Sequence, residues 1–316
     1  MTLPCRFSVQ FFAALLTLAC AGQAFAAQAF IIVDAKTGHV LQERDSRQKR
    51  QVASLTKVAT AMVVLDWAER HQGDLGQIAT VPPEALLGVT ENLVGLQPGD
   101  QVSLRDCLYA ALIQSDNVSA YTLANHVGQA IQGIVPAGAS RTPVSNFVSQ
   151  MNALAKNLKM DRTKFANPQG LDTDVKPVPY SSAMDMARLT RYALNKAGFR
   201  FYVSQKERQI SWNRAGSKKD YMLRNTNELL GQDGVDGVKT GRTTRAGDCL
   251  IVSAQRQAEV IKTGENSASV MPRNLIIVML ASPNRFQEGR QLIGLGWQLH
   301  EQWVATGRLI DPKKVL

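Results

Sequence analysis

The fold is decided by the stretch Leu275-Ile276-Ile277-Val278-Met279-Leu280 and a matching stretch near the other end, Ala29-Phe30-Ile31-Ile32-Val33. Short apolar runs of this kind, bounded by turn residues, are typical of β-strands. Residues 238–240 and 249–254 have the same character, and we expect them to neighbour residues 275–280 in one antiparallel sheet. Residues 39–42, after the turn at 34–38, complete a hairpin with residues 29–33.

The middle of the chain has a different periodicity. Apolar residues recur at spacings of three and four, which predicts helices at 54–70, 104–113, 118–127, 144–158, 184–194 and 287–305. Strands at both ends with helices between them indicate an α/β fold, an antiparallel sheet flanked by helices with an inserted helical subdomain. We expect one folded domain over 27–306, with the helical subdomain at about 85–195 and a C-terminal tail at 307–316.

The first 26 residues have the pattern of an export signal. Arg6 precedes an apolar run at 11–21, and Ala24-Phe25-Ala26 fits the small-x-small cleavage rule. A run of about 11 residues is shorter than the ~20 that a membrane span needs. We therefore expect cleavage after Ala26, an extracytoplasmic protein, and no stable membrane anchor. Lipidation at Cys20 is the lesser alternative, because Thr17 stands where a leucine is expected.

Composition excludes several classes of function. The 316 residues carry 36 Lys plus Arg against 26 Asp plus Glu, a net charge of +10, but the basic residues are scattered. Without a basic cluster or a zinc-finger spacing, we expect no nucleic-acid partner. The four histidines stand far apart and form no metal-binding pattern, so we expect no metal and no cofactor. Cys107 and Cys249 lie in apolar contexts, which favours two buried thiols over a disulfide.

Three short motifs carry the chemistry. In Ser54-Leu55-Thr56-Lys57 the hydroxyl and the amine stand at i and i+3 on one helical face, at the start of a helix. Ser115-Asp116-Asn117 follows 61 residues later, between two predicted helices. Lys239-Thr240-Gly241 follows after another 124, on a predicted strand, where Lys and Thr can bind a carboxylate and Gly leaves room for a ligand.

Each motif alone is weak, because the chain contains false copies. Ser46-Arg47-Gln48-Lys49, Ser211-Trp212-Asn213 and Lys262-Thr263-Gly264 match equally well but lie in unsuitable contexts. The order of the three motifs and their placement at a helix start, an inter-helix loop and a strand are what is specific. This combination is the known signature of penicillin-binding proteins and class A β-lactamases.

The chain resembles the serine-type D-Ala-D-Ala carboxypeptidases, the low-molecular-mass penicillin-binding proteins of peptidase family S11. The resemblance is carried by the three motifs, by Phe165-Ala166-Asn167-Pro168-Gln169-Gly170-Leu171, by residues 180–187 (YSSAMDMA), and by residues 235–243 (VDGVKTGRT). It covers roughly residues 29–306 and implies a β-lactamase/DD-peptidase-like fold. The chain resembles short members without the C-terminal β-rich domain, and its long connection at 256–273 departs from the family.

The resemblance implies a role for each site residue. Ser54 would be the nucleophile, Lys57 its general base, and Ser115 the group that passes a proton to the leaving amine. Asn117 would position the peptide, and the backbone amides of Ser54 and Arg242 would form the oxyanion hole. The substrate's carboxylate would be held by Lys239, Thr240, Gly241 and Arg290. An ordinary lysine has a pKa near 10.4, so burial and a second cation, Lys239, should lower that of Lys57.

The implied function is removal of the terminal D-Ala from peptidoglycan stem peptides, with β-lactams as covalent inhibitors. A DD-endopeptidase that cleaves D-Ala cross-links is the main alternative. A class A β-lactamase needs a deacylating Glu, and none occurs between Glu91 and Glu207. A non-catalytic wall-binding module would not need all three motifs intact.

Overall fold

The computed structural model describes residues 25–71, 73–132, 142–172, 176, 178–264 and 267–316. The predicted export signal at 1–26 lies almost entirely outside the described residues. The central sheet has the strand order β2-β1-β9-β8-β7, with every neighbouring pair antiparallel. Its strands are β1 (Ala29–Asp34), β2 (Val40–Arg44), β7 (Val235–Thr243), β8 (Gly247–Gly264) and β9 (Ser267–Ser282).

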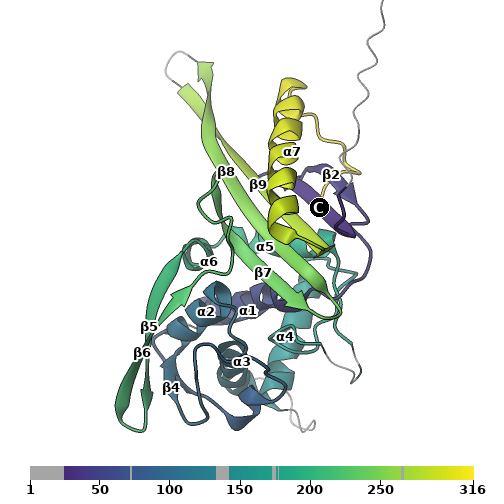
Figure 1. Cartoon of the computed structure of the whole chain (residues 1–316). Helices are drawn as coiled ribbons and strands as arrows, with labels where there is room; N and C mark the ends of the chain where they lie inside the picture. The colour runs from purple at the N-terminus through teal and green to yellow at the C-terminus, as the bar shows by residue number, and fades with distance from the viewer. Residues whose placement is uncertain (1–24, 72, 133–141, 173–175, 177, 265–266) are drawn as a thin grey trace, which may run out of the picture.

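The two apolar stretches from opposite ends of the chain are adjacent in this sheet. Strand β1 pairs with β9 from Ala29 opposite Leu280 to Asp34 opposite Leu275 (Figure 1). Because strand side chains alternate between faces, β1 contributes to two cores. Ile31 and Val33 join the larger core, whereas Phe30 and Ile32 join the smaller one. The prediction of an antiparallel sheet built from both ends is confirmed.

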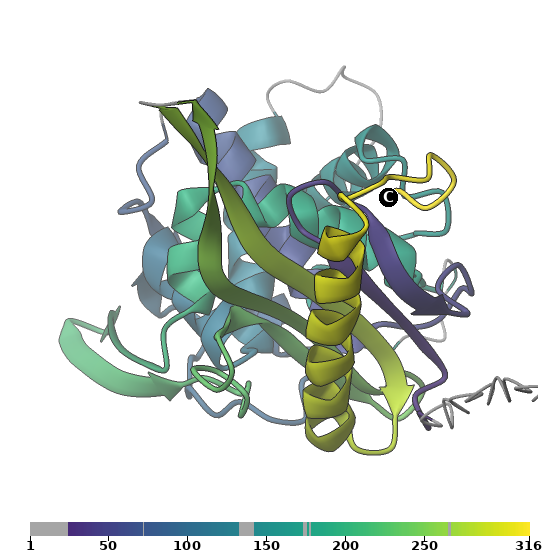
Figure 2. The ribbon, with the colours of Figure 1, turned by 90° about the horizontal axis from the view of Figure 1, so that it is seen from above.

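Helices cover both faces of the sheet. The long helix α7 (Arg285–Ala305) lies across one face, as Figure 2 shows from above, and its Leu292 and Trp297 fill the smaller core. On the other face, α5 (Ala183–Leu194) packs against β1 and β9. The helices α2 (Leu104–Ile113), α3 (Asn117–Gln132) and α4 (Pro143–Asn157) follow the predicted pattern closely.

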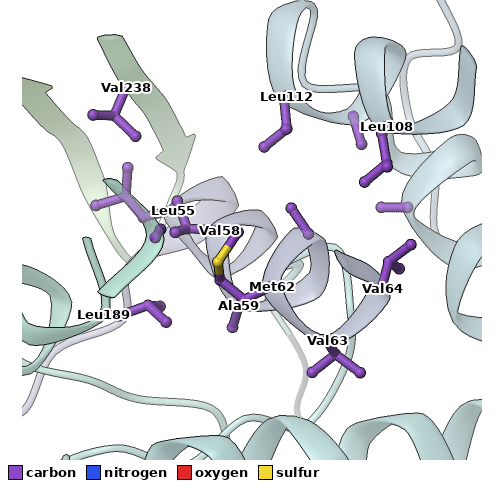
Figure 3. Close-up of a cluster of buried hydrophobic side chains, with 14 of the residues drawn as sticks. Leu55, Val58, Ala59, Met62, Val63, Val64, Leu108, Leu112, Leu189 and Val238 are labelled. Atoms are coloured by element: carbon purple, nitrogen blue, oxygen red, sulfur yellow. The ribbon is translucent and has the colours of Figure 1, made fainter. Parts of the chain in front are cut away.

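The first predicted helix has two parts. A 3₁₀ turn, η1 (Ala53–Thr56), leads into α1 (Lys57–Arg70), so the α-helix proper begins three residues later than predicted. Val58 and Met62 of α1 lie in a buried cluster with Leu108 of α2, Leu189 of α5 and Val238 of β7 (Figure 3). Each buried side chain of this size contributes about 1.5–3 kcal/mol, so packing on several sides fixes α1 in place.

A second sheet was not predicted. Its order is β3-β4-β5-β6, formed by β3 (Ile78–Thr80), β4 (Gln101–Ser103), β5 (Glu207–Arg214) and β6 (Ser217–Arg224). The short elements η2 (Pro83–Leu86) and α6 (Ala197–Val203) were missed as well. The helices of the inserted subdomain fall where expected, but its boundaries at about 85–195 remain a prediction.

Two peripheral segments complete the fold. Strands β8 and β9 stay paired as far as Gly264 opposite Ser267, so residues 256–264 and 267–273 form the two arms of an extended hairpin, as predicted, that projects beyond the sheet (Figure 1). The tail at 307–316 returns to the β1–β2 turn, where Val40 N donates to Lys314 O at 2.8 Å. Within the described residues, no helix is long and apolar enough to span a membrane. Cys107 and Cys249 are both buried and unpaired, as predicted.

Candidate active site

Ser54 lies in the second position of η1, immediately before α1. Ala53, the residue before it, has a left-handed φ of +49°, and the N-cap position of the turn is Val52. Ser54 is therefore not the N-cap residue of η1 or of α1. Gly170 packs directly against this turn and leaves no room for a side chain, because a Cβ at Gly170 would lie 2.0 Å from Ala53 O. Gly170 itself has a φ of +84°, which also favours glycine.

Lys57 is buried directly behind Ser54. Its Nζ donates hydrogen bonds to Ser54 Oγ at 2.9 Å, Asn117 Oδ1 at 2.7 Å and Gln169 O at 2.8 Å. These three acceptors use all three donors of an ammonium group. Burial lowers the pKa of Lys57 to about 7, while the carboxylate of Asp116 opposes the shift. At neutral pH a large fraction of Lys57 is therefore an amine whose lone pair can accept the Ser54 proton.

The Ser115-Asp116-Asn117 motif joins α2 to α3 at the edge of the same site. Ser115 has a φ of +66° and lines the cavity, and Asn117 reaches Lys57 as described. No hydrogen bond found among the described residues joins Ser115 to Lys57, so its relay role stays a prediction. Asp116 received no role from the sequence, yet its Oδ1 accepts Ser119 N at 2.6 Å, which caps α3. Burial raises the pKa of Asp116.

Strand β7 brings the third motif against Ser54. Lys239 is 1% exposed and donates to Thr240 O at 2.9 Å, and Thr240 Oγ1 lies 2.6 Å from Thr226 Oγ1. A Cβ at Gly241 would lie 3.0 Å from Ser54 N, so glycine allows the strand to approach the nucleophile turn closely. Burial, with repulsion from Lys57 and Arg285, holds the pKa of Lys239 well below its usual value. A second cation thus lowers the pKa of Lys239, whereas the pKa of Lys57 is lowered by burial alone.

Of the two arginines in the first turns of α7, Arg285 rather than Arg290 lines the cavity. Arg290 is exposed, donates from Nε to Gln232 Oε1 at 3.4 Å, and does not line the cavity. Arg285, five residues earlier and about 140° round the helix, lines the cavity instead. Its Nη1 donates to Gly241 O at 3.0 Å, while its buried Nε has no hydrogen-bond partner in the described chain. Arg290 lies on another side of α7, so its role in carboxylate binding stays a prediction, and the geometry favours Arg285 for that role.

These elements enclose a cavity of about 550 Å³. Lys57 and Lys239 lie beneath its surface rather than in its wall. The wall contains Ser54, Ser115, Asn117, Thr240, Gly241, Arg242 and Arg285 from the motifs and α7, together with Glu91 and Asp172. Arg242 is exposed beside Asp248, with Nε 3.5 Å from Oδ1. Asp172 is held by Thr243, whose Oγ1 donates to Oδ1 at 2.9 Å.

The comparisons agree with this geometry. One family model, Peptidase_S11 (D-alanyl-D-alanine carboxypeptidase), matches residues 17–263, and the chain belongs to this family. The D-alanyl-D-alanine carboxypeptidase DacD of Escherichia coli is 32% identical over 86% of the chain. A D-alanyl-D-alanine endopeptidase of the same organism is 31% identical over 70% of the chain and 65% of its own length. The chain spans 63% of the length of DacD.

Solved structures show the same fold. The Streptomyces K15 DD-transpeptidase superposes with a TM-score of 0.72 at 25% identity, over 87% of this chain and 98% of its own. Penicillin-binding protein D2 of Listeria monocytogenes, in its ampicillin-bound form, gives a TM-score of 0.66 at 25% identity, over 87% and 98%. The predicted DD-peptidase-like fold is confirmed.

Proposed function

We propose that this protein is a serine-type D-Ala-D-Ala carboxypeptidase that removes the terminal D-Ala of peptidoglycan stem peptides through an acyl-enzyme on Ser54. One observation carries the proposal: Lys57 Nζ contacts Ser54 Oγ and Asn117 Oδ1 beneath a cavity whose opposite wall is β7. A serine activated by a buried lysine, next to a strand with anion-binding side chains, suits acyl transfer from a peptide with a free C-terminal carboxylate.

The acylation step follows from the positions of the two groups. Neutral Lys57 takes the proton of Ser54 as Oγ attacks the carbonyl carbon of the scissile bond, and the new C–O bond gives a tetrahedral oxyanion. The backbone amides of Ser54 and Arg242 stabilise that oxyanion. When the C–N bond breaks, the proton passes through Ser115 to the leaving amine, and D-Ala departs. Water then hydrolyses the ester with Lys57 again as base.

Recognition of the terminal carboxylate is assigned to Lys239, Thr240 and Arg285. Arg285 has an unpartnered buried Nε, and Lys239 lies just beneath the wall of the cavity. A carboxylate entering next to Lys239 favours the protonated ammonium, since a nearby opposite charge raises a depressed lysine pKa. Gly241 leaves room for the substrate backbone beside β7, and Asn117 positions the peptide from the facing loop.

The same site acylates with β-lactams, and the protein acts outside the cytoplasm, on the cell wall. Relatives support both statements, because a similar structure holds ampicillin and the family is named for D-alanyl-D-alanine carboxypeptidases. The second candidate, a DD-endopeptidase, is supported by the 31% identity to the Escherichia coli endopeptidase.

Purified muropeptides separate the two activities. The mature protein is incubated with a monomeric pentapeptide and, separately, with a D-Ala cross-linked dimer, and the products are resolved by chromatography. The carboxypeptidase proposal expects tetrapeptide and free D-Ala from the monomer at a much higher rate than cleavage of the dimer. Faster cleavage of the dimer would establish the endopeptidase instead.

A further inference from the structure

Glu288 is a buried carboxylate in the first turn of α7, and it is not one of the residues that line the cavity. It is 7% exposed. Its Oε1 accepts the backbone N–H of Ala27 at 3.0 Å and that of Ala26, and its Oε2 accepts the Ser282 hydroxyl. All three donors are neutral. No salt bridge joins Glu288 to a cation among the described residues, and because a buried carboxylate without a cation is costly, the arrangement suggests that a positive charge belongs here.

The position of the predicted cleavage supplies that charge. Ala24-Phe25-Ala26 is the small-x-small pattern of a leader-peptidase site. Hydrolysis of the Ala26–Ala27 amide bond consumes one water and leaves a carboxylate on Ala26 and an α-amino group on Ala27, which is protonated at neutral pH. The nitrogen that becomes the cation is the atom 3.0 Å from Glu288 Oε1.

We propose that Glu288 is the receptor for the mature N-terminus, and that the α-ammonium of Ala27 forms a buried ion pair with it once the chain is cut after Ala26. The cut end needs little rearrangement, because Ala27 is fully buried in the smaller core. Arg44 donates to Ala27 O, and Gln28 N donates to Leu280 O at 3.2 Å. These contacts do not involve the leader and survive its removal.

In the part of the chain that the structure describes, the charged side chains that contact Ala27 come from two elements. Glu288 comes from α7 and Arg44 from β2, while β9 presents the neutral Ser282. The guanidinium of Arg44 is engaged by the carbonyls of Ala27 and Phe25, and the latter leaves with the leader. Glu288 is therefore the one anion among the described residues that faces the new cation at hydrogen-bond distance.

Docking of the N-terminus also bears on the active site, a consequence that rests on the proposed function. Arg285 and Glu288 stand three residues apart in the first turn of α7 and share one side of it. Glu288 ties that turn to the chain start and to Ser282, while Arg285 ties it to Gly241 O. The ion pair would thus hold the arginine assigned to the substrate carboxylate.

The test compares two forms of the protein. One begins at Ala27, released from a fusion cut directly before it, and the other carries Gly-Ser before Ala27, so that the nitrogen is an amide. Both are made in the wild type, in Glu288→Gln, and in the control Glu301→Gln, an exposed acid of α7 that pairs with Arg256. The free N-terminus should raise the folding equilibrium constant roughly 10- to 150-fold, as for a charged hydrogen bond. The advantage should vanish in Glu288→Gln and persist in Glu301→Gln.

The pH dependence of the stability difference between the two forms distinguishes an ion pair at Ala27 from steric crowding by the added Gly-Ser. An α-amino group has a pKa of about 7.7–8.0 when unfolded, and the ion pair raises the folded value. The advantage is therefore full below about pH 7.7 and is lost as the pH rises through the folded value. A difference that is independent of pH, or unchanged in Glu288→Gln, would overturn the proposal. So would an exported protein whose sequenced N-terminus is not Ala27. Penicillin labelling of all forms tests the proposed function separately. The folding measurement reports only on docking of the N-terminus and requires no catalytic turnover.

Discussion

At the scale of single residues, the central feature is a lysine whose pKa lies near neutral pH. Lys57 is buried and its pKa lies near 7, so the neutral amine that the proposed mechanism uses as a base is depleted in acid. We expect kcat/KM for a stem pentapeptide to fall about tenfold per pH unit below pH 6, with an inflection near 7. Stopped-time assays of D-Ala release between pH 5 and 9 measure this limb.

A variant of Asp116 sharpens this expectation. The Asp116 carboxylate raises the pKa of Lys57, so Asp116→Asn should move the inflection to lower pH. The asparagine can still cap α3 through its side-chain oxygen. Asp106→Asn, in the first turn of α2, is the matched control and should leave the inflection unchanged. A rate that is flat from pH 5 to 8 in the wild type would remove Lys57 as the base.

Carboxylate recognition is a second expectation at this scale. Lys239→Ala and Arg285→Ala should each reduce kcat/KM for a peptide with a free C-terminus by about 10- to 150-fold, since a charge-assisted hydrogen bond is worth roughly 1.5–3 kcal/mol. An uncharged depsipeptide ester should lose much less. Arg290→Ala should change neither rate, because Arg290 lies outside the cavity wall. Equal losses on both substrates would mean that Lys239 acts through Lys57 instead.

At the scale of elements, the nucleophile turn depends on a loop from elsewhere in the sequence. Gly170 supports η1, and its neighbour Gln169 accepts a hydrogen bond from Lys57. Gly170→Ala should destabilise the protein by about 1–3 kcal/mol, because it combines a positive φ with a backbone clash. It should also slow acylation by penicillin, since η1 must move.

The control for this prediction is Gly198→Ala. Gly198 lies in α6, and a Cβ there would meet no atom within 4 Å. Alanine favours a helix over glycine, so stability should be equal or slightly higher and acylation unchanged. Thermal unfolding and penicillin acylation rates are measured on both variants. An unaffected Gly170→Ala protein would show that the loop does not fix η1.

Elements with strong periodicity were predictable from the sequence, and those with mostly exposed side chains were not. The central strands are buried on both faces, so they are continuous apolar runs that are easily recognised in the sequence. The predicted helix at 104–113 coincides with α2. By contrast, β5 and β6 expose most of their side chains, and only residues such as Ile210 and Trp212 are buried. Their pairing depends on tertiary context, which local patterns do not encode.

The site shows the same division. Ser54, Lys57 and Asn117 meet as the motif spacing implied, because helices and strands hold motif residues rigidly. The Arg285 contact could not be derived from sequence. Choosing between Arg285 and Arg290 required the rotation of α7 relative to the sheet. Asp116 affects Lys57 because its carboxylate is buried nearby, and Gln169 contacts Lys57 through its backbone carbonyl. Neither burial nor a backbone contact leaves a recognisable pattern in the sequence.

At the scale of the whole molecule, the site should acylate with β-lactams faster than it deacylates. The penicilloyl group keeps its leaving group tethered, and a β-lactamase overcomes this with a carboxylate that activates water. Three acids line the cavity: Asp116, which is buried and caps α3, Glu91, which is exposed, and Asp172, which is held by Thr243 Oγ1 and Arg245 N. Rapid mixing with a chromogenic cephalosporin should give a stoichiometric burst and then a slow steady state.

Variants identify any acid that contributes to the slow phase. If neither Glu91 nor Asp172 activates water, Glu91→Gln and Asp172→Asn should leave the steady-state rate within about twofold. Sustained fast turnover without a burst would contradict the expectation. A loss of that turnover in one variant would then identify the deacylating residue.

The central claim is that Ser54 is the nucleophile that releases D-Ala, and the most direct measurement is D-Ala release from a stem pentapeptide by three proteins. The mature wild type should release one D-Ala per peptide, and Ser54→Ala should release none and take up no radiolabelled penicillin. Ser46→Ala, in the false copy of the motif, should retain both activities, because Ser46 contacts Glu43 rather than a buried lysine. Release of D-Ala by Ser54→Ala at a rate comparable to the wild type would contradict the account.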